Sequence, residues 1–389
     1  MKRSADRILT THVGSLARPE VLLDLMRSRA LGEPYDDQAY DEAVRRAVAT
    51  CVRDQAASGL DSVSDGEQGK IGHATYIGER LEGFERHGDS RVSLGKLFEA
   101  EITAFPGYYE QYFSVAMAGG AIAPSPPLIC TGPVSYKGHD ALKRDLDNLW
   151  AAVDALDHDW QGEAFVPAIA PSKVGSNRYY DSEDEYLFAV ADALRIEYEA
   201  IVDAGFILQI DDPYLTEIYG LPGESLTEQH RRAEVCVEAI NQAIRNIPEE
   251  KIRFHTCYGI NEGPRVHDVD LSQIIEVVLR INAGAYLFEA ANPRHEHEYH
   301  IWERVRLPEG KVLIPGVITH STNIVEHPEL IAERIVRFAE RVGRENVIAG
   351  TDCGFASQAS YKPEIHPTVA QAKLRALAEG ARTATDRLW

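Results

Sequence analysis

His255 and Cys257, separated by a single threonine, are the pair of side chains in this sequence whose chemistry best suits a metal ion. In an extended segment alternate side chains lie on one face, so the imidazole and the thiol would point to the same place. A Zn²⁺ ion needs about four ligands of this kind. Glu289 and Cys353, each at the end of an apolar segment, are two further candidates. A His-x-Cys pair by itself is more often a hydrogen-bonded imidazole beside a packed thiol. Whether this pair binds a metal therefore has to be judged from the fold around it.

The candidate ligands are expected to follow β-strands that alternate with helices. Apolar segments ending in Gly, Asp or Ser are separated by helical patterns, which is typical of parallel βαβ units. Capping boxes beginning at Ser182 and Ser225, and Pro328 at a first helical position, predict three of the helix starts. The extended segment 163–172 lies in a long connection containing two prolines and is not counted as a barrel strand. We expect eight strands, at residues 8–15, 60–65, 128–135, 206–213, around His255, 285–290, 311–319 and 346–353.

Eight strands alternating with helices predict an α/β fold, the (β/α)8 or TIM barrel, as a single catalytic domain over residues 1–389. Residues from about 70 to 126 are rich in Tyr, Phe and Gly, and we interpret them as a hairpin or lid inserted into the barrel. Reactive groups of such barrels lie at the carboxyl ends of the strands. Core packing alone would not gather so many reactive side chains there, so the pattern favours a metal site. The residues at or just beyond these ends are Ser15, Glu67, Asp211, Asp212, His255, Cys257, Glu289, His320 and Cys353.

The composition excludes several classes of partner. A formal net charge of −21 argues against binding nucleic acid, whose phosphates attract Lys and Arg, and against an anionic membrane surface. The N-terminal residues do not show a secretion signal, and apolar segments of membrane-spanning length are missing, so the cytoplasm is the expected compartment. Five cysteines are an odd number in a long chain, which argues against a disulfide framework and leaves thiols free for metal. A homo-oligomer is compatible with the sequence.

The chain resembles the catalytic C-terminal barrel of the cobalamin-independent methionine synthases, and more closely the shorter single-barrel proteins of that superfamily. The resemblance covers nearly the whole sequence. Its marks are Thr11-His12-Val13-Gly14-Ser15, Asp65-Gly66-Glu67, Gln209-Ile210-Asp211-Asp212-Pro213, the His255 and Cys257 pair, Glu289, Pro315-Gly316-Val317 and Asp352-Cys353-Gly354.

This resemblance implies a zinc-dependent transfer of a methyl or alkyl group to a thiol, most simply homocysteine. It implies that His255, Cys257, Glu289 and Cys353 bind Zn²⁺, the expected cofactor. Zinc lowers the pKa of a thiol, so that a thiolate exists at neutral pH. The ammonium group of homocysteine would meet Glu67 and Asp211, and its carboxylate would meet the backbone around Ser15.

Further site residues follow from the same resemblance. Asp212 stands where the family has glutamate in an Asp-Glu-Pro motif, His320 is the expected proton donor, and Tyr136 stands near the family's tryptophan that contacts the pterin. His12 and Glu217 are expected at the same mouth, either in contact with substrate or in a structural hydrogen bond. The N-terminal barrel that helps to hold polyglutamylated folate is not part of this sequence. We therefore expect a smaller or protein-delivered methyl donor.

Two other reactions fit parts of the pattern. A related zinc enzyme adds coenzyme M to epoxides, but the sulfonate of that thiol should require Arg or Lys rather than carboxylates. A metal-free lyase of the uroporphyrinogen decarboxylase type would leave His255, Cys257 and Cys353 as packing residues. The tract 292–298 is either a polar loop over the barrel mouth or a substrate contact.

Overall fold

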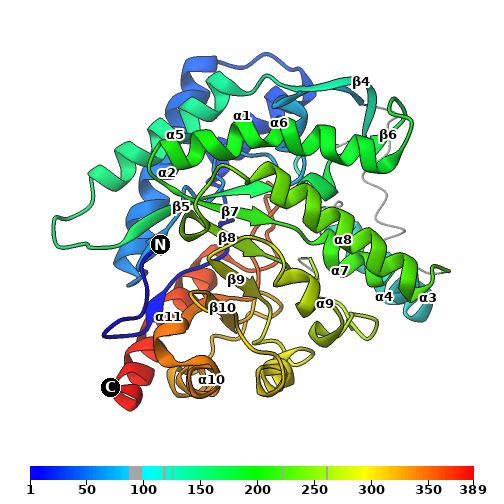
Figure 1. Cartoon of the computed structure of the whole chain (residues 1–389). Helices are drawn as coiled ribbons and strands as arrows, with labels where there is room; N and C mark the ends of the chain where they lie inside the picture. Colours follow the sequence, from blue (N-terminus) through cyan, green and yellow to red (C-terminus); the bar gives the residue numbers. More distant parts are fainter. Residues whose placement is uncertain (87–98, 117–119, 125, 221–222, 260–261) are drawn as a thin grey trace.

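A parallel eight-stranded sheet curved into a barrel forms the centre of the molecule (Figure 1). The computed structural model describes residues 1–86, 99–116, 120–124, 126–220, 223–259 and 262–389. Neighbouring strands follow the order β1-β11-β10-β9-β8-β7-β5-β2. Their bounds are β1 Leu9–Thr10, β2 Ser62–Val63, β5 Glu163–Ile169, β7 Ile207–Asp211, β8 Ile252–His255, β9 Ala285–Phe288, β10 Val312–Ile318 and β11 Ile348–Thr351.

The barrel closes between β1 and β2, which are its shortest strands. The backbone N–H of Asp61 donates to the carbonyl of Thr10 at 3.1 Å, and the N–H of Thr10 donates to the Asp61 carboxylate at 2.9 Å. Arg7 holds the same carboxylate with two hydrogen bonds of 2.6 and 2.8 Å. A side chain thus completes the ring where strand pairing is brief, and the predicted (β/α)8 barrel is confirmed.

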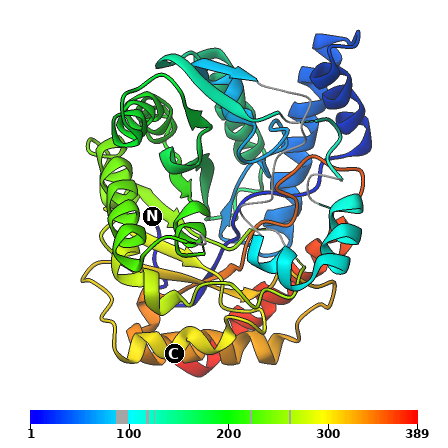
Figure 2. The same ribbon diagram turned by 90° about the vertical axis from the view of Figure 1, so that its right-hand side faces the viewer.

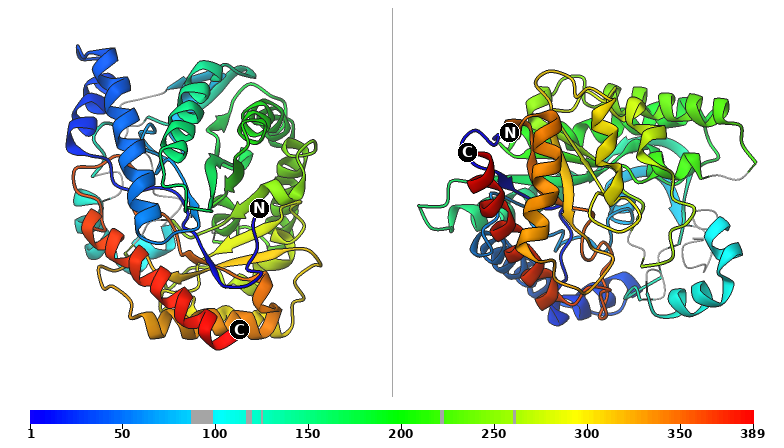
Figure 3. Two further views of the ribbon diagram at one scale, coloured as in Figure 1. Left: turned by 90° about the vertical axis from the view of Figure 1, so that its left-hand side faces the viewer. Right: turned by 90° about the horizontal axis from the view of Figure 1, so that it is seen from below.

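Helices surround the barrel on its outer side (Figure 3). The predicted starts are confirmed: the hydroxyl of Ser182 accepts from Glu185 N at 3.1 Å, that of Ser225 accepts from Glu228 N at 3.3 Å, and Pro328 begins α10. The main helices of this outer layer are α1 Glu20–Leu31, α2 Asp37–Ala57, α5 His139–Asp154, α6 Glu183–Asp203, α8 Leu226–Ala243, α9 Leu271–Val278, α10 Pro328–Val342 and α11 Pro367–Leu388. Among the described residues, no helix combines the length and apolar character needed to cross a bilayer.

The third barrel strand differs from the prediction. The segment expected there, 128–135, belongs to β4 Leu128–Tyr136, which pairs with β3 Leu81–Arg86 and β6 Ser176–Asn177 in a separate three-stranded sheet. The third barrel strand is β5, within the segment 163–172 that was not counted. The prolines suggested that this segment could not be a barrel strand. Pro167 is tolerated because β2 pairs only with Glu163 and Ala164, so no N–H is required of Pro167 there, and its carbonyl accepts a hydrogen bond from Lys70 Nζ at 2.6 Å. β5 is buried along almost its whole length, whereas buried and more accessible residues are mixed along β4.

The predicted insertion is longer than 70–126, because β3 within it pairs with β4 beyond it. Residues 87–98, 117–119 and 125 of this segment lie outside the described residues. Helices α3 Glu99–Ala104 and α4 Pro106–Val115 contact loops that follow barrel strands. The Glu101 carboxylate accepts from His267 N at 2.8 Å, and the Tyr112 hydroxyl donates to Glu364. Both helices therefore lie over the carboxyl-end mouth of the barrel, on the side away from the chain termini (Figures 1 and 2).

Candidate metal centre and substrate site

Three of the four predicted metal-binding side chains meet at the mouth of the barrel. His255 is the last residue of β8, Cys257 follows it by two residues, and Cys353 follows the end of β11 by two. Their candidate ligand atoms all lie within 4.8 Å of one another, and the two sulfur atoms are 3.3 Å apart. All three side chains are buried. Neither ring nitrogen of His255 has a hydrogen-bond partner among the described residues.

This arrangement fits a zinc ion. A buried imidazole without any partner is costly unless a ligand satisfies it. Tetrahedral zinc with Zn–S bonds of about 2.3 Å separates two thiolates by about 3.8 Å, so the observed sulfur pair needs only a small adjustment. Burial, together with nearby Arg253, His73 and His320, lowers the pKa of His255 to about 3, so the imidazole is neutral, the form that binds metal.

Glu289, the fourth predicted ligand, lies near Cys353 and is hydrogen-bonded to other residues. It directly follows β9, and its carboxylate is fully engaged by neighbours. One oxygen, Oε2, accepts from Arg265 Nη2 at 2.7 Å and from Asn292 Nδ2 at 2.8 Å, and Oε1 accepts from the backbone N–H of Tyr258 at 3.0 Å. The structure groups Glu289 with His320 and Asp352 rather than with His255 and the two cysteines.

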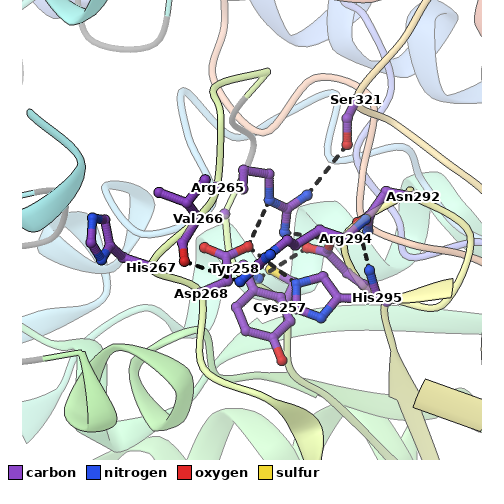
Figure 4. Close-up of polar contacts among 12 residues, drawn as sticks. Cys257, Tyr258, Arg265, Val266, His267, Asp268, Asn292, Arg294, His295 and Ser321 are labelled. Atoms are coloured by element: carbon purple, nitrogen blue, oxygen red, sulfur yellow. Dashed lines mark hydrogen bonds and ion pairs between the residues drawn. The ribbon is translucent and has the colours of Figure 1, made fainter. Parts of the chain in front are cut away.

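Arg265, which no sequence pattern indicated, is the cation at the centre of this region. It lies in the loop after β8, is 4% exposed, and has a left-handed φ of 58°. Its Nε donates to Asp268 at 2.7 Å and its Nη1 donates to Ser321 at 3.3 Å, in addition to the Glu289 contact (Figure 4). Three loops that follow β8, β9 and β10 are therefore joined by one guanidinium group.

His295 lies on the far side of Asp268 from Arg265. Its Nε2 is 3.1 Å from Asp268 Oδ2, its Nδ1 is 2.9 Å from Glu298 Oε2, and its ring stacks on Tyr258 with centroids 4.0 Å apart (Figure 4). Burial by itself would lower its pKa, but the hydrogen bonds to Asp268 and Glu298 outweigh it and raise the pKa to about 9. The tract 292–298 thus contributes a buried cation, which packs against the loop that carries Arg265.

Two buried carboxylates, those of Glu67 and Asp211, lie near enough to each other to interact electrostatically. Glu67, 3% exposed with a φ of 56°, leaves its Oε2 without a hydrogen-bond partner among the described residues. Asp211 ends β7 and accepts from Gln209 at 2.8 Å. Burial, and then the charge of Glu67, raises the pKa of Asp211 well above its usual value. Lys70, another residue missed in the sequence, reaches only to 3.9 Å from Glu67 Oε1. A cation between the two carboxylates would relieve this repulsion.

Ser15 borders the cysteine loop after β11. Its carbonyl accepts a hydrogen bond from Phe355 N at 3.0 Å. A Cβ atom on Gly354 would lie 2.0 Å from the Ser15 hydroxyl, so the close approach of the two segments requires glycine there. Ser15 is therefore beside Cys353, as a residue that contacts the substrate next to the metal would need to be.

The other predicted site residues have well-defined protein partners. His12 Nε2 is 2.6 Å from Gln55 Oε1. The Asp212 carboxylate accepts from Tyr214 N at 2.9 Å, from Leu215 N at 3.3 Å and from the Ser172 hydroxyl at 2.5 Å, where the helix α7 Tyr214–Tyr219 begins. Glu217 is half-buried on this same helix.

His320 and Tyr136 differ in their relation to the mouth. His320 is buried, its Nε2 is 3.3 Å from the carbonyl of Gly259, and burial and Arg265 lower its pKa to about 4. Tyr136 lies on β4 in the three-stranded sheet, where the residue is 7% exposed and its hydroxyl donates to Glu197 at 2.8 Å. The structure places His320 with Glu289 and Asp352, near enough to His255 to act on its pKa, but keeps Tyr136 in the packed side sheet.

Comparisons with known proteins agree with this architecture. The family model described as "Cobalamin-independent synthase, Catalytic domain" matches residues 170–375. A methionine synthase of Thermococcus kodakarensis is 24% identical over 350 residues, which cover 89% of this chain and 86% of that protein. One from Saccharolobus islandicus is 24% identical over 385 residues, covering 97% and 95%. The solved structure of a B12-independent methionine synthase from Shewanella sp. W3-18-1, in complex with selenomethionine, has a TM-score of 0.73 at 20% identity and covers 98% of this chain and 99% of that one.

Proposed function

Because the chain belongs to the family of the cobalamin-independent synthase catalytic domain, we propose that it is a zinc-dependent methyltransferase that methylates the thiol of homocysteine. The names of its relatives, which are methionine synthases, support the same reaction. The observation that carries the proposal is the meeting, at one end of the barrel, of two thiols and a neutral imidazole that has no hydrogen-bond partner in the described part of the chain.

His255, Cys257 and Cys353 would hold the metal. When bound, Zn²⁺ supplies a positive charge that lowers the pKa of a thiol in contact with it, so that a nucleophilic thiolate exists at neutral pH. Because both thiols are buried and must be reduced to bind metal, the cytoplasm is a suitable compartment. The whole chain, including its insertion, is proposed to act as one catalytic domain.

Glu67 and Asp211 are proposed to bind the ammonium group of the amino-acid thiol. The free oxygen of Glu67 can accept a hydrogen bond from it, and the positive charge would allow both carboxylates to be ionised. The substrate carboxylate is proposed to lie against the backbone around Ser15. These contacts fix the distance between the ammonium group and the sulfur atom, and so favour homocysteine over a thiol that carries only a sulfonate.

The remaining residues are proposed to act on the donor and on the shape of the mouth. Methyl transfer forms a sulfur–carbon bond and breaks the bond between the methyl group and its carrier, which then needs a proton. His320 is neutral at pH 7, because its pKa is about 4, and is proposed to relay that proton rather than to store it. Asp212 is proposed to hold α7, and with it Glu217, at the mouth.

The test is methionine formation by purified protein loaded with about one zinc per chain. Methyltetrahydrofolate and smaller methyl donors are offered with homocysteine, and methionine is measured by mass spectrometry. Cys257→Ser should lose both zinc and activity. Cys236→Ser is the matched control, because Cys236 is a buried thiol on α8 in the hydrophobic core, outside the candidate centre. A zinc-loaded protein that methylates no homocysteine with any donor, but alkylates coenzyme M, would refute the proposal.

A further inference from the structure

We infer that Arg253 is a positioning residue, which acts through Gln209 to hold the Asp211 carboxylate in place for the ammonium group of the substrate. The inference rests on the proposed function, in which Asp211 binds that group, and deepens it. It assigns a role to a buried cation inside the barrel that no sequence motif marks and that the candidate metal centre does not use.

The register of β7 and β8 is the first argument. In this parallel pair Gln209 lies beside Arg253, and two residues further along Asp211 lies beside His255. Alternate residues of a strand share a face of the sheet, so the four side chains form two successive layers on one face. All four are buried. Gln209 and Arg253 therefore lie directly beneath the layer in which the proposed ammonium site begins.

The hydrogen bonds between the two layers are the second argument. Arg253 Nε donates to Gln209 Oε1 at 2.7 Å, and Gln209 Nε2 donates to Asp211 Oδ1 at 2.8 Å and to the carbonyl of Val13. A guanidinium group can only donate, so the amide turns its oxygen to Arg253 and its NH₂ group to Asp211. Burial raises the pKa of Asp211, and the hydrogen bond from Gln209 and the charge of Arg253 oppose that rise. One carboxylate oxygen is thus fixed from below, and Oδ2 is left for the ammonium group.

The anchoring of Arg253 is the third argument. Its Nη1 donates to the Thr11 hydroxyl at 2.9 Å and its Nη2 donates to the carbonyl of His12 at 2.5 Å. The guanidinium carbon lies 3.6 Å from the centre of the Phe165 ring on β5. The hydrogen-bond acceptors of Arg253 in the described part of the chain are all neutral, and a buried cation without a carboxylate partner is costly. An apolar side chain would fill this space at less cost, so the fixed cation is explained by its effect on Asp211.

The experiment compares the binding of two thiols to zinc-loaded protein by calorimetric titration, without a methyl donor. One thiol is homocysteine, and the other is 4-mercaptobutanoate, which is homocysteine without its amino group. Both bring the same sulfur to the metal, so the ratio of their dissociation constants reports on the ammonium group. Arg253→Met should reduce the preference for homocysteine by about tenfold, the size expected for one hydrogen bond to a charged group.

Three further variants make the comparison specific. Gln209→Met interrupts the same connection and should reduce the preference by a similar factor, even if Arg253→Met does not fold. Asp211→Asn removes the carboxylate charge, so adding Arg253→Met to it should change the ratio no further. Arg334→Met is the matched control, because Arg334 is a buried arginine on α10 that pairs with Glu296 at 3.0 Å, and its loss should leave the wild-type preference.

A purely structural role for Arg253 would weaken the binding of both thiols by the same factor. The inference is therefore overturned if folded Arg253→Met, or folded Gln209→Met, keeps the wild-type ratio. It is also overturned if Arg253→Met lowers the ratio as strongly in the Asp211→Asn protein as in wild type, because Arg253 would then act on some other group.

This result is separable from the proposed reaction, because thiol binding is measured without methyl transfer. If the preference falls as expected but no donor yields methionine, the reaction is wrong and the role of Arg253 stands. If methionine forms and Arg253→Met keeps the preference, the reaction stands and the role of Arg253 is wrong. Wild-type protein that binds the two thiols equally would overturn both the ammonium site and the role of Arg253.

Discussion

The sulfur atoms of Cys257 and Cys353 lie 3.3 Å apart, although 96 positions separate the two residues in the chain. They follow β8 and β11, which are not neighbours in the sheet, since β9 and β10 lie between them. The thiols therefore meet across the mouth of the barrel rather than along one edge of it. The hydrogen bond with the Cys257 thiol, and then burial, raise the pKa of Cys353 well above its usual value, so metal binding must release a proton there.

The thiol pair should be sensitive to oxidation when the metal is removed. We expect metal-free protein treated with diamide, which accepts two electrons and two protons, to form a disulfide between Cys257 and Cys353. Zinc-loaded protein should resist, because both sulfurs are then bound. Peptide mass spectrometry under non-reducing conditions identifies the cross-link. Cys236→Ser should behave like wild type, and equal rates of oxidation with and without zinc would contradict a shared metal site.

Removing the charge of Asp211 should weaken homocysteine binding yet stabilise the protein. Asp211→Asn leaves the ammonium group with one charged partner fewer, which costs about 1–3 kcal/mol of binding, roughly 5- to 150-fold in dissociation constant. The same change removes a buried carboxylate whose pKa is raised by burial and by Glu67, so the Tm at pH 7 should rise.

Calorimetric titration and thermal denaturation measure the two effects of Asp211→Asn. Asp203→Asn, at an exposed position on α6, is the control and should change neither. Unchanged homocysteine affinity in Asp211→Asn would show that the ammonium group is bound elsewhere.

His295 should make stability depend on pH on the alkaline side. Its pKa of about 9 in the folded protein lies above 6.5, the ordinary value, so its contribution is fully present below pH 6.5 and is lost as the pH rises through 9. The size is about 3 kcal/mol at most. Urea unfolding of wild type and His295→Gln at pH 6 and pH 10 gives the difference, which should shrink at the higher pH. A gap between the two proteins that is the same at both pH values would show that His295 is not charged by its neighbours.

The Tyr136 hydroxyl should contribute to the stability of the protein and not to binding of the methyl donor. Its hydroxyl donates to buried Glu197, so Tyr136→Phe should lower the free energy of unfolding by about 1 kcal/mol or somewhat more. The KM for the methyl donor should not change, because the ring packs within the side sheet. Urea unfolding and initial rates over a range of donor concentrations test both points. A raised KM with unchanged stability would restore the stacking role that the sequence suggested.

Much of the barrel could be predicted, because strand ends and helix starts have local signals. Ser182 and Ser225 cap helices through their own hydroxyl groups, and residues such as Asp211 and His255 end apolar segments. The exchange of β4 for β5 could not be predicted from local pattern. Both segments are extended, and only the tertiary structure decides which one lies in the barrel and is covered on both faces.

The candidate site could likewise be predicted only in part. His255, Cys257 and Cys353 stand at strand ends, where the barrel brings them together, and their role as ligands stays a prediction. The pairing of Glu289 with Arg265 had no signal in the sequence, because it depends on how loops after β8, β9 and β10 meet. An arginine in a loop carries no periodicity, and its burial is visible only in the folded chain.

The order of the elements along the chain separates the residues proposed to bind the metal from the segment that covers the mouth. Every side chain proposed to hold the metal lies from β8 onward, within the part that matches the family model, whereas Glu67 and the covering helices α3 and α4 come before β5. In the described part of the chain, the covering helices contact the metal-binding half through hydrogen bonds such as those of Glu101 with His267 and of Tyr112 with Glu364. A new donor preference can therefore be engineered, or can evolve, by exchanging the covering segment while the machinery that prepares the nucleophile is inherited intact.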